Sequence, residues 1–142
     1  SNRIRGVVLH DVLARVVRAS DLEDAVRSVV MDGMMSLEES DEVHALLKSA
    51  IGKVSVYGWF PENPDRVLNE AELIDTSGNV SRPDRVVIAG GKVSVIDFKF
   101  GEHHSRYERQ VKGYAELWRR MGYEDVSAFL WYVQTGEVMR IM

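Results

Sequence analysis

The chain has 142 residues, a length that suits one domain, and 45% of them are hydrophobic, enough to form a packed core. It contains no cysteine, which excludes disulfides, thiolate zinc sites and iron–sulfur clusters and leaves oxygen and imidazole as metal ligands. Taken alone, the net charge of −4 argues against a nucleic-acid partner, because proteins that bind nucleic acid are usually basic.

Three helices are predicted in the first part of the chain. Apolar residues recur at helical spacing over 4–19, and Ser20 or Asp21 can cap a second helix. A third helix, 36–51, begins with the Ser-x-x-Glu pattern of a capping box and stops at Gly52. The chain does not begin with Met, which suggests a fragment of a longer protein. It has no apolar run long enough to cross a bilayer and no recognisable signal peptide.

Three strands are predicted next, over 67–74, 82–89 and 92–100. The turns between them, Ser77-Gly78-Asn79 and Gly90-Gly91, are short, so we expect an antiparallel meander. Glu70 and Glu72 then share one strand face.

The last part of the chain predicts one helix and two further strands. The helix covers 104–121 and ends at Gly122, and the strands cover 126–133 and 137–141. One face of that helix is expected to be apolar; its residues are Tyr107, Val111, Tyr114, Trp118 and Met121. The order of elements predicts an α/β or α+β fold, with residues 1–142 as a single domain.

The residues with chemical potential are Asp84, Asp97 and Lys99. Asp97 and Lys99 are two apart on an apolar strand, so their side chains share a face about 7 Å apart along the backbone. Charges there are costly unless they are paired or bound to a metal. Asp84 begins the preceding strand and can reach the same end of the sheet. Two carboxylates and a backbone carbonyl can bind Mg²⁺, and Lys99 can orient water or stabilise negative charge. A structural Asp97–Lys99 ion pair is the alternative.

These motifs resemble a known family. Pro83-Asp84 followed by Asp97-Phe98-Lys99 resembles the signature of PD-(D/E)XK nucleases, and especially the RecB-like nuclease domains at the C-terminus of UvrD/AddA-type helicase–nucleases. Over residues 4–133, three more elements are similar to that branch: Gly6-Val-Val-Leu-His10, Glu70, and Gln110-Val-Lys-Gly-Tyr114.

The resemblance implies a mixed sheet of about five strands, with N-terminal helices and one helix after the motif strand. It implies an Mg²⁺- or Mn²⁺-dependent deoxyribonuclease, more often an exonuclease than an endonuclease, serving cytoplasmic DNA repair or recombination. Its implied partners are DNA and a helicase motor, and no membrane. The implied catalytic residues are Asp84, Asp97, Lys99 and Glu70. The implied metal ligands are His10, Asp84, Asp97 and the Phe98 carbonyl. The implied DNA contacts are Gln110, Tyr114, Arg106 and Lys112. Without cysteine, the iron–sulfur cluster of many relatives is excluded.

Each assignment has a plainer alternative. His10 and Tyr114 also fit core positions, Gln110 and the basic residues of 99–120 also fit a solvated helix face, and Glu72 competes with Glu70. His103 and His104 lie outside the motifs, in a segment expected to be a flexible loop. At the level of function, the alternatives are a catalytically silent DNA-binding or scaffold domain on the same fold and an unrelated small-molecule-binding domain.

Overall fold

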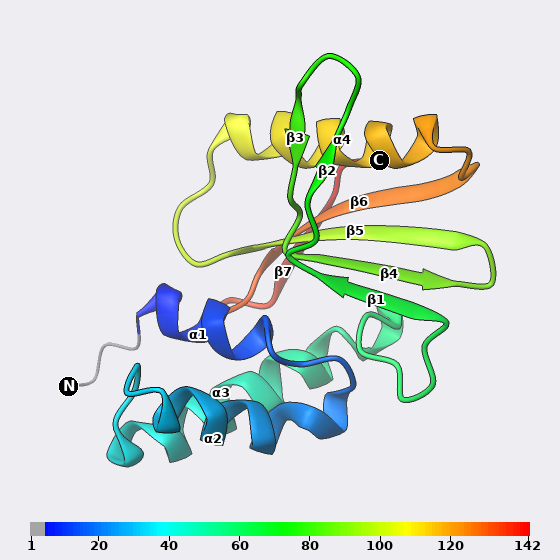
Figure 1. The fold of residues 1–142 in the computed structure, drawn as a ribbon. Helices are drawn as coiled ribbons and strands as arrows, with labels where there is room; N and C mark the ends of the chain where they lie inside the picture. Colours follow the sequence, from blue (N-terminus) through cyan, green and yellow to red (C-terminus); the bar gives the residue numbers. More distant parts are fainter. Residues whose placement is uncertain (1–4) are drawn as a thin grey trace. The chain divides into compact units, whose positions relative to one another are not determined.

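A computed structural model describes residues 5–142, so the predicted helix start at Ile4 lies outside the described residues. The chain forms two compact units. The first contains the described residues up to Asn63 together with Val133–Gly136, and the second contains Pro64–Tyr132 and Glu137–Met142 (Figure 1). Within residues 5–142, no helix combines the length and the apolar character needed to cross a membrane.

The first unit is helical. Its elements are α1 (Gly6–Leu13), the 3₁₀ turn η1 (Ala19–Asp21), α2 (Leu22–Met31), α3 (Leu37–Lys53) and the 3₁₀ turn η2 (Ser55–Tyr57). The three helices bury one apolar face each; the fully buried side chains include Leu9, Leu13, Val29, Val43 and Leu47. The prediction of three helices in this part of the chain is therefore confirmed.

The first helix is shorter than predicted. It ends at Leu13, and the amides of Arg15 and Val16 make tighter bonds to the carbonyls of Val12 and Leu13. The chain then turns because Asp21 Oδ2 accepts hydrogen bonds from the next two amides, those of Val17 and Arg18, at 3.1 and 2.8 Å.

The N-terminus of α2 lacks the side-chain cap that was predicted, because the Asp21 carboxylate bonds to the loop before the helix. Asp21 occupies the cap position, but its carboxylate is turned back to the preceding loop, and Ser20 Oγ donates instead to Glu62 Oε1 at 2.7 Å. Neither side chain therefore caps the helix. An apolar repeat extends through this region, but the carboxylate of Asp21 stabilises the turn.

The start of α3 follows the prediction. Ser36 Oγ accepts from the Glu39 amide at 3.2 Å, and Glu39 Oε1 accepts from the Ser36 amide at 3.2 Å, which completes a capping box. The predicted stop at Gly52 is wrong, because α3 continues to Lys53. The first glycine after α3 with a left-handed backbone is Gly58, which has φ 70° and follows η2.

The second unit is a five-stranded mixed sheet with one covering helix. The strands lie in the order β1 (Arg66–Asn69), β4 (Arg85–Ala89), β5 (Lys92–Lys99), β6 (Asp125–Tyr132) and β7 (Glu137–Arg140). β5 and β6 are parallel, and the other three neighbouring pairs are antiparallel. The helix α4 (Ser105–Arg120) makes the crossover between the parallel strands (Figure 1). This architecture confirms the predicted mixed α/β fold.

A separate hairpin interrupts the predicted meander. The predicted strand 67–74 is divided: β1 ends at Asn69, Glu70 adopts a left-handed backbone with φ 56°, and the chain leaves the sheet. β2 (Leu73–Ile74) and β3 (Val80–Ser81) then pair only with each other. The turn at Ser77-Gly78-Asn79 therefore closes this hairpin instead of joining β1 to β4. Glu70 and Glu72 consequently do not share a strand face, and that expectation is wrong.

The turn at Gly90-Gly91 is where it was predicted. Both glycines have positive φ, 57° and 80°, as the two central residues of a type I′ hairpin turn require. The turn pairs Ala89 with Lys92 and fixes the register along β4 and β5, so that Val86 lies opposite Val95.

The face of the sheet under α4 forms a hydrophobic core. The buried residues of this core from the sheet are Val86, Ile88, Val93, Val95, Val126, Ala128, Leu130 and Tyr132, and those from α4 are Val111, Ala115 and Trp118. Tyr107 and Tyr114 pack against it partly buried, as predicted, whereas Met121 is 51% exposed. Because alternate residues of a strand share a face, Asp97 and Lys99 extend the row that begins with Val93 and Val95.

Candidate active site

Three acidic residues stand next to one another across the sheet. The ladder between β1 and β4 ends at Asn69 opposite Arg85, and the ladder between β4 and β5 ends at Arg85 opposite Ile96. One position further, the same registers bring together Glu70, Asp84 and Asp97. The Glu70 amide still donates to the Asp84 carbonyl at 3.1 Å, so the row is held by the backbone.

Where the backbone ladder between β4 and β5 ends, the carboxylates of Asp84 and Asp97 accept the hydrogen bonds of the backbone amides. The Asp84 amide donates to Asp97 Oδ1 at 3.0 Å, and the Phe98 amide donates to Asp84 Oδ2 at 2.7 Å. Each carboxylate is therefore oriented by a backbone donor of the neighbouring strand. The two carboxyl groups are fixed beside each other at the end of β5 before any ligand is considered.

The electrostatics of this pair are unfavourable when both groups are ionised. Burial and, after it, the negative charge of Asp84 raise the pKa of Asp97 from 3.8 to about 6, although the Asp84 amide and Lys99 act in the opposite direction. The side chain of Asp97 is only 6% exposed. A positive ligand between the two carboxylates would relieve both penalties.

The ammonium group of Lys99 lies beside the Asp84–Asp97 pair. Its Nζ lies 3.4 Å from Asp97 Oδ2 and 4.2 Å from the centroid of the Tyr107 ring. The ion pair that was the plainer alternative is thus present, but it joins a cluster that contains a second carboxylate. One ammonium group beside two carboxylates leaves a formal excess of negative charge.

A family model for the PD-(D/E)XK nuclease superfamily matches residues 1–141. The chain belongs to the PD-(D/E)XK nuclease superfamily. It is thus a nuclease domain, of a class that generally uses divalent metal ions such as Mg²⁺. No curated protein matches the chain.

Glu70 is placed beside the paired carboxylates of this nuclease domain, and Glu72 is not. Glu70 is half-buried at the end of the acidic row, and its Oε2 lies 3.1 Å from Arg82 Nη2. Glu72 is exposed in the segment between β1 and β2. The backbone geometry therefore favours Glu70 of the two candidates that the sequence left open. Arg82, its ion-pair partner, has no pattern in the sequence that marks it.

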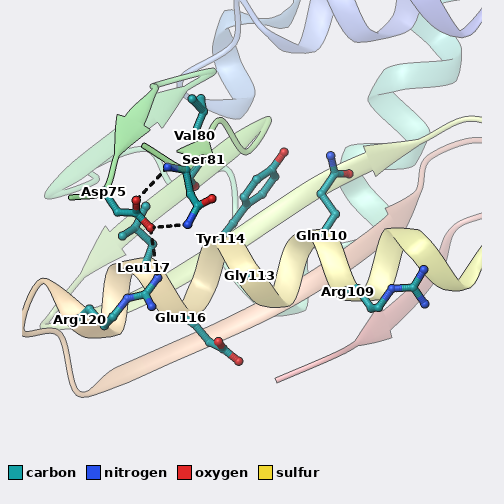
Figure 2. Close-up of a pocket in the computed structure, with 11 residues that line it drawn as sticks. Asp75, Val80, Ser81, Arg109, Gln110, Gly113, Tyr114, Glu116, Leu117 and Arg120 are labelled. Atoms are coloured by element: carbon teal, nitrogen blue, oxygen red, sulfur yellow. Dashed lines mark hydrogen bonds and ion pairs between the residues drawn. The ribbon is translucent and has the colours of Figure 1, made fainter. Parts of the chain in front are cut away.

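Two predicted residues of α4 belong to the same neighbourhood. Burial raises the pKa of Tyr114, as do the charges of Asp97 and Asp84, whereas hydrogen bonds with the Gln110 side chain and the Arg82 backbone lower it. Tyr114 therefore lies within electrostatic reach of the carboxylates and is tied to Gln110. The predicted pairing of Gln110 and Tyr114 on one helix face agrees with Figure 2.

A pocket of about 360 Å³ adjoins these two residues, between α4 and the β2–β3 hairpin (Figure 2). Arg109 and Arg120 also line it, and Arg120 Nη2 lies 3.9 Å from Asp75 Oδ2. Neither arginine belongs to a motif of the sequence that marks it as a site residue. Both arginines line the pocket because the β2–β3 hairpin packs along this side of α4.

The remaining predicted residues are more dispersed. His10 is half-buried on α1 in the first unit, and its role as a metal ligand stays a prediction. Arg106 and Lys112 are exposed on α4; the Arg106 guanidinium carbon lies 5.2 Å from the Tyr107 ring centroid, and Lys112 is not among the residues that line the pocket. His103 is held in place, since it lies 2.8 Å from Glu137 and stacks on Tyr132.

The donor set fits a divalent metal with few protein ligands. Within residues 5–142, no group of three or more His, Asp and Glu side chains is arranged to hold a metal ion. Asp84 and Asp97 would contribute two carboxylate oxygens. Mg²⁺ commonly binds through one or two carboxylates and keeps several waters, so this pair matches its coordination chemistry.

Proposed function

We propose that this nuclease domain hydrolyses phosphodiester bonds in DNA with an Mg²⁺ or Mn²⁺ ion held by Asp84 and Asp97. The observation that carries the proposal is the side-by-side orientation of these two carboxylates by each other's strand, with the Lys99 ammonium 3.4 Å from one of them. Two ionised carboxylates side by side, one of them buried and the other half-buried, are costly, and a divalent cation would offset the cost.

The bound ion would supply Lewis acidity and lower the pKa of a coordinated water. Asp84, Asp97 and the carbonyl of Phe98 would hold it. Glu70, at the end of the acidic row, is proposed as a further catalytic carboxylate. His10 is proposed as a further ligand on the strength of its motif in the sequence.

Lys99 has a different role from the carboxylates. A protonated amine has no lone pair to offer a metal, so Lys99 would not be a ligand. Its ammonium instead orients the attacking water or stabilises the negative charge that develops on the phosphate. Its position beside Asp97 supports this role, because the charge is held at the edge of the proposed metal site.

The proposed DNA contacts extend from this site along α4. Gln110 and Tyr114 line the pocket between α4 and the β2–β3 hairpin, and Arg106 and Lys112 supply exposed positive charge on the same helix. Contacts between basic side chains and phosphates provide affinity without reading the base sequence. These basic side chains would attract DNA to α4 although the whole chain has a net charge of −4.

We further propose that the domain works in the cytoplasm as the nuclease module of a DNA repair or recombination helicase, acting as an exonuclease. This part rests on the resemblance of Gly6–His10, Glu70 and Gln110–Tyr114 to the RecB-like motifs. A helicase motor in the same polypeptide or complex would deliver the strand to be cut.

A cleavage assay tests the proposal. Linear single- and double-stranded DNA is incubated with Mn²⁺ and with wild type, Asp97→Ala or Lys99→Ala, using the longest available form of the protein. Asp97→Ala should lose both cleavage and Mn²⁺ binding. Lys99→Ala should lose about a hundredfold in rate while keeping much of its Mn²⁺ and DNA affinity. Glu72→Gln is the matched control for removal of a nearby charge.

Two outcomes would overturn the proposal. Cleavage that survives Lys99→Ala undiminished would remove Lys99 from the mechanism. The absence of cleavage by the full protein under every metal and substrate condition would identify a silent DNA-binding or scaffold domain.

A further inference from the structure

The aromatic ring of Tyr107 lies against the ammonium group of Lys99. Lys99 is the last residue of β5 and Tyr107 lies in the first turn of α4, so the contact spans the loop 100–104. Nζ is 4.2 Å from the ring centroid, well inside the range of about 6 Å for a cation–π interaction. The Lys99 side chain is only 16% exposed, so the contact is partly shielded from water.

Lysine needs such a restraint if it is to act at one point. Its four-carbon stem is flexible, and holding it in one geometry loses rotamer entropy. A second restraint on the ammonium group is its 3.4 Å contact with Asp97 Oδ2. A divalent cation on Asp97 would compete for the same negative charge and weaken that contact. The ring carries no formal charge, so it would still hold the ammonium group in place.

We propose that Tyr107 is a positioning residue, whose ring holds the Lys99 ammonium at the edge of the acidic pair by a cation–π contact. The inference rests on the proposed function, since it assigns Tyr107 a role through Lys99. The hydroxyl group is not required by this role. The face of the ring is required, together with its negative electrostatic potential.

Tyr107 also has contacts that would fit a purely structural role. It packs against the core under α4, its ring meets the His104 ring edge to face at 5.2 Å, and the Arg106 guanidinium carbon lies 5.2 Å from its centroid. A packing role depends on the volume of the side chain, whereas a cation–π role depends on the electron density of the ring. The two can therefore be separated at constant shape.

The experiment replaces Tyr107 with Phe and then with Phe analogues that carry one, two, three and five ring fluorines. Fluorination changes the volume little and removes the negative potential of the ring face step by step. The first readout needs no metal and no turnover: the ring-current shift of the Lys99 side-chain protons, measured by NMR on the metal-free protein. The second is the DNA-cleavage rate in Mn²⁺.

We expect Tyr107→Phe to keep both the NMR shift and the rate. Along the fluorinated series, the Lys99 shift should move steadily toward its solvent-exposed value, and kcat should fall to about a tenth or less of wild type. Mn²⁺ affinity and KM should change little. The same series at Tyr123, which packs on the same core beside Trp118, controls for fluorination and should leave both readouts unchanged.

The outcomes separate this inference from the proposed function. If wild type cleaves, Lys99→Ala does not, and the fluorinated series keeps the full rate and the Lys99 shift, then Tyr107 does not position Lys99 and the inference is wrong. A further variant, Tyr107→Leu, removes the ring. If the cleavage rate falls in Tyr107→Leu together with its melting temperature, but stays unchanged along the fluorinated series, the inference is also wrong, because that result indicates a packing role. If Lys99→Ala itself cleaves normally, the proposed mechanism fails while the metal-free NMR series still decides whether the ring holds Lys99.

Discussion

At the scale of single residues, the Asp84–Asp97 pair is electrostatically unfavourable when both carboxyl groups are ionised. Both carboxylates accept backbone hydrogen bonds at 2.7–3.0 Å, yet burial and the neighbouring charge raise the pKa of Asp97 to about 6. The folded chain thus keeps a carboxyl group where its ionised form is disfavoured. Such a conflict between stability and local charge is characteristic of functional sites.

This conflict predicts how stability depends on pH. The pKa of folded Asp97, about 6, exceeds its ordinary value of 3.8, so the unfolded chain releases this proton first. The contribution of Asp97 to the free energy of unfolding is therefore lost as pH rises from about 4 to about 6. Asp97→Asn should stabilise the metal-free protein at pH 7 by on the order of 1–3 kcal/mol and have little effect at pH 4.

Urea unfolding of wild type and variant at both pH values measures this effect. Asp125→Asn, at the exposed start of β6, controls for the removal of one carboxylate from the sheet. A gain of the same size at pH 4 and pH 7 would mean that charge burial is not its cause.

A second residue-scale prediction separates Glu70 from Glu72. Glu70 extends the row of Asp84 and Asp97, and Glu72 is exposed outside the strands. Glu70→Gln should lower the cleavage rate at least about tenfold, whereas Glu72→Gln should leave it unchanged. Rates of the two variants on the same DNA substrate provide the comparison. Equal losses, or a loss confined to Glu72→Gln, would exclude Glu70 as the additional site carboxylate.

At the scale of elements, the turn between β4 and β5 determines which acids meet. Gly90 and Gly91 both adopt positive φ, and the resulting register places Asp84 opposite Asp97. Gly91→Ala should destabilise the protein by about 1 kcal/mol, because a side chain is strained at φ 80° although open space surrounds it. Urea unfolding tests this, and Gly113→Ala on α4, where φ is helical, should instead stabilise. Stabilisation by both alanines would contradict the strain argument.

The elements also indicate which parts of the fold can be predicted from sequence. The capping box at Ser36, the glycine turn before β5 and the amphipathic α4 depend on local patterns, and all three are present. The early end of α1 depends on a hydrogen bond to Asp21, four residues beyond Val17. The division of the predicted strand at Glu70 depends on a hairpin that packs on α4. Periodicity contains no information about such contacts.

In the candidate site, too, the residues placed by local patterns were predictable and those placed by contacts between distant segments were not. Asp97 and Lys99 were predictable because alternate residues on a strand share a face, and Asp84 because a tight turn brings its strand back. Tyr107 and Arg82 were not predictable as neighbours of this cluster. Their contacts with Lys99 and Glu70 arise from the crossover helix and the inserted hairpin, which bring together residues that no short motif connects.

At the scale of the whole molecule, metal binding should stabilise the native state by mass action. Mn²⁺ at 100 times its Kd should add about 2.7 kcal/mol to the free energy of unfolding of wild type. Asp97→Asn should abolish this gain. His10→Ala should reduce it, because the motif Gly6–His10 predicts this histidine as a metal ligand. The gain should also decline below about pH 6, where a proton competes for Asp97.

Thermal melts with and without Mn²⁺ measure this gain. Identical responses of wild type and Asp97→Asn would place the metal elsewhere, and an undiminished response of His10→Ala would remove His10 from the ligand set.

The most direct measurement of the central claim is the location of the metal itself. Crystals grown with Mn²⁺ at pH 7 or above would be examined by anomalous diffraction at the manganese edge. Our account predicts a peak between the carboxylates of Asp84 and Asp97, close to the carbonyl of Phe98, that disappears in Asp97→Asn crystals grown in the same way. Mn²⁺ bound only at other residues, at a concentration that supports DNA cleavage, would contradict the account.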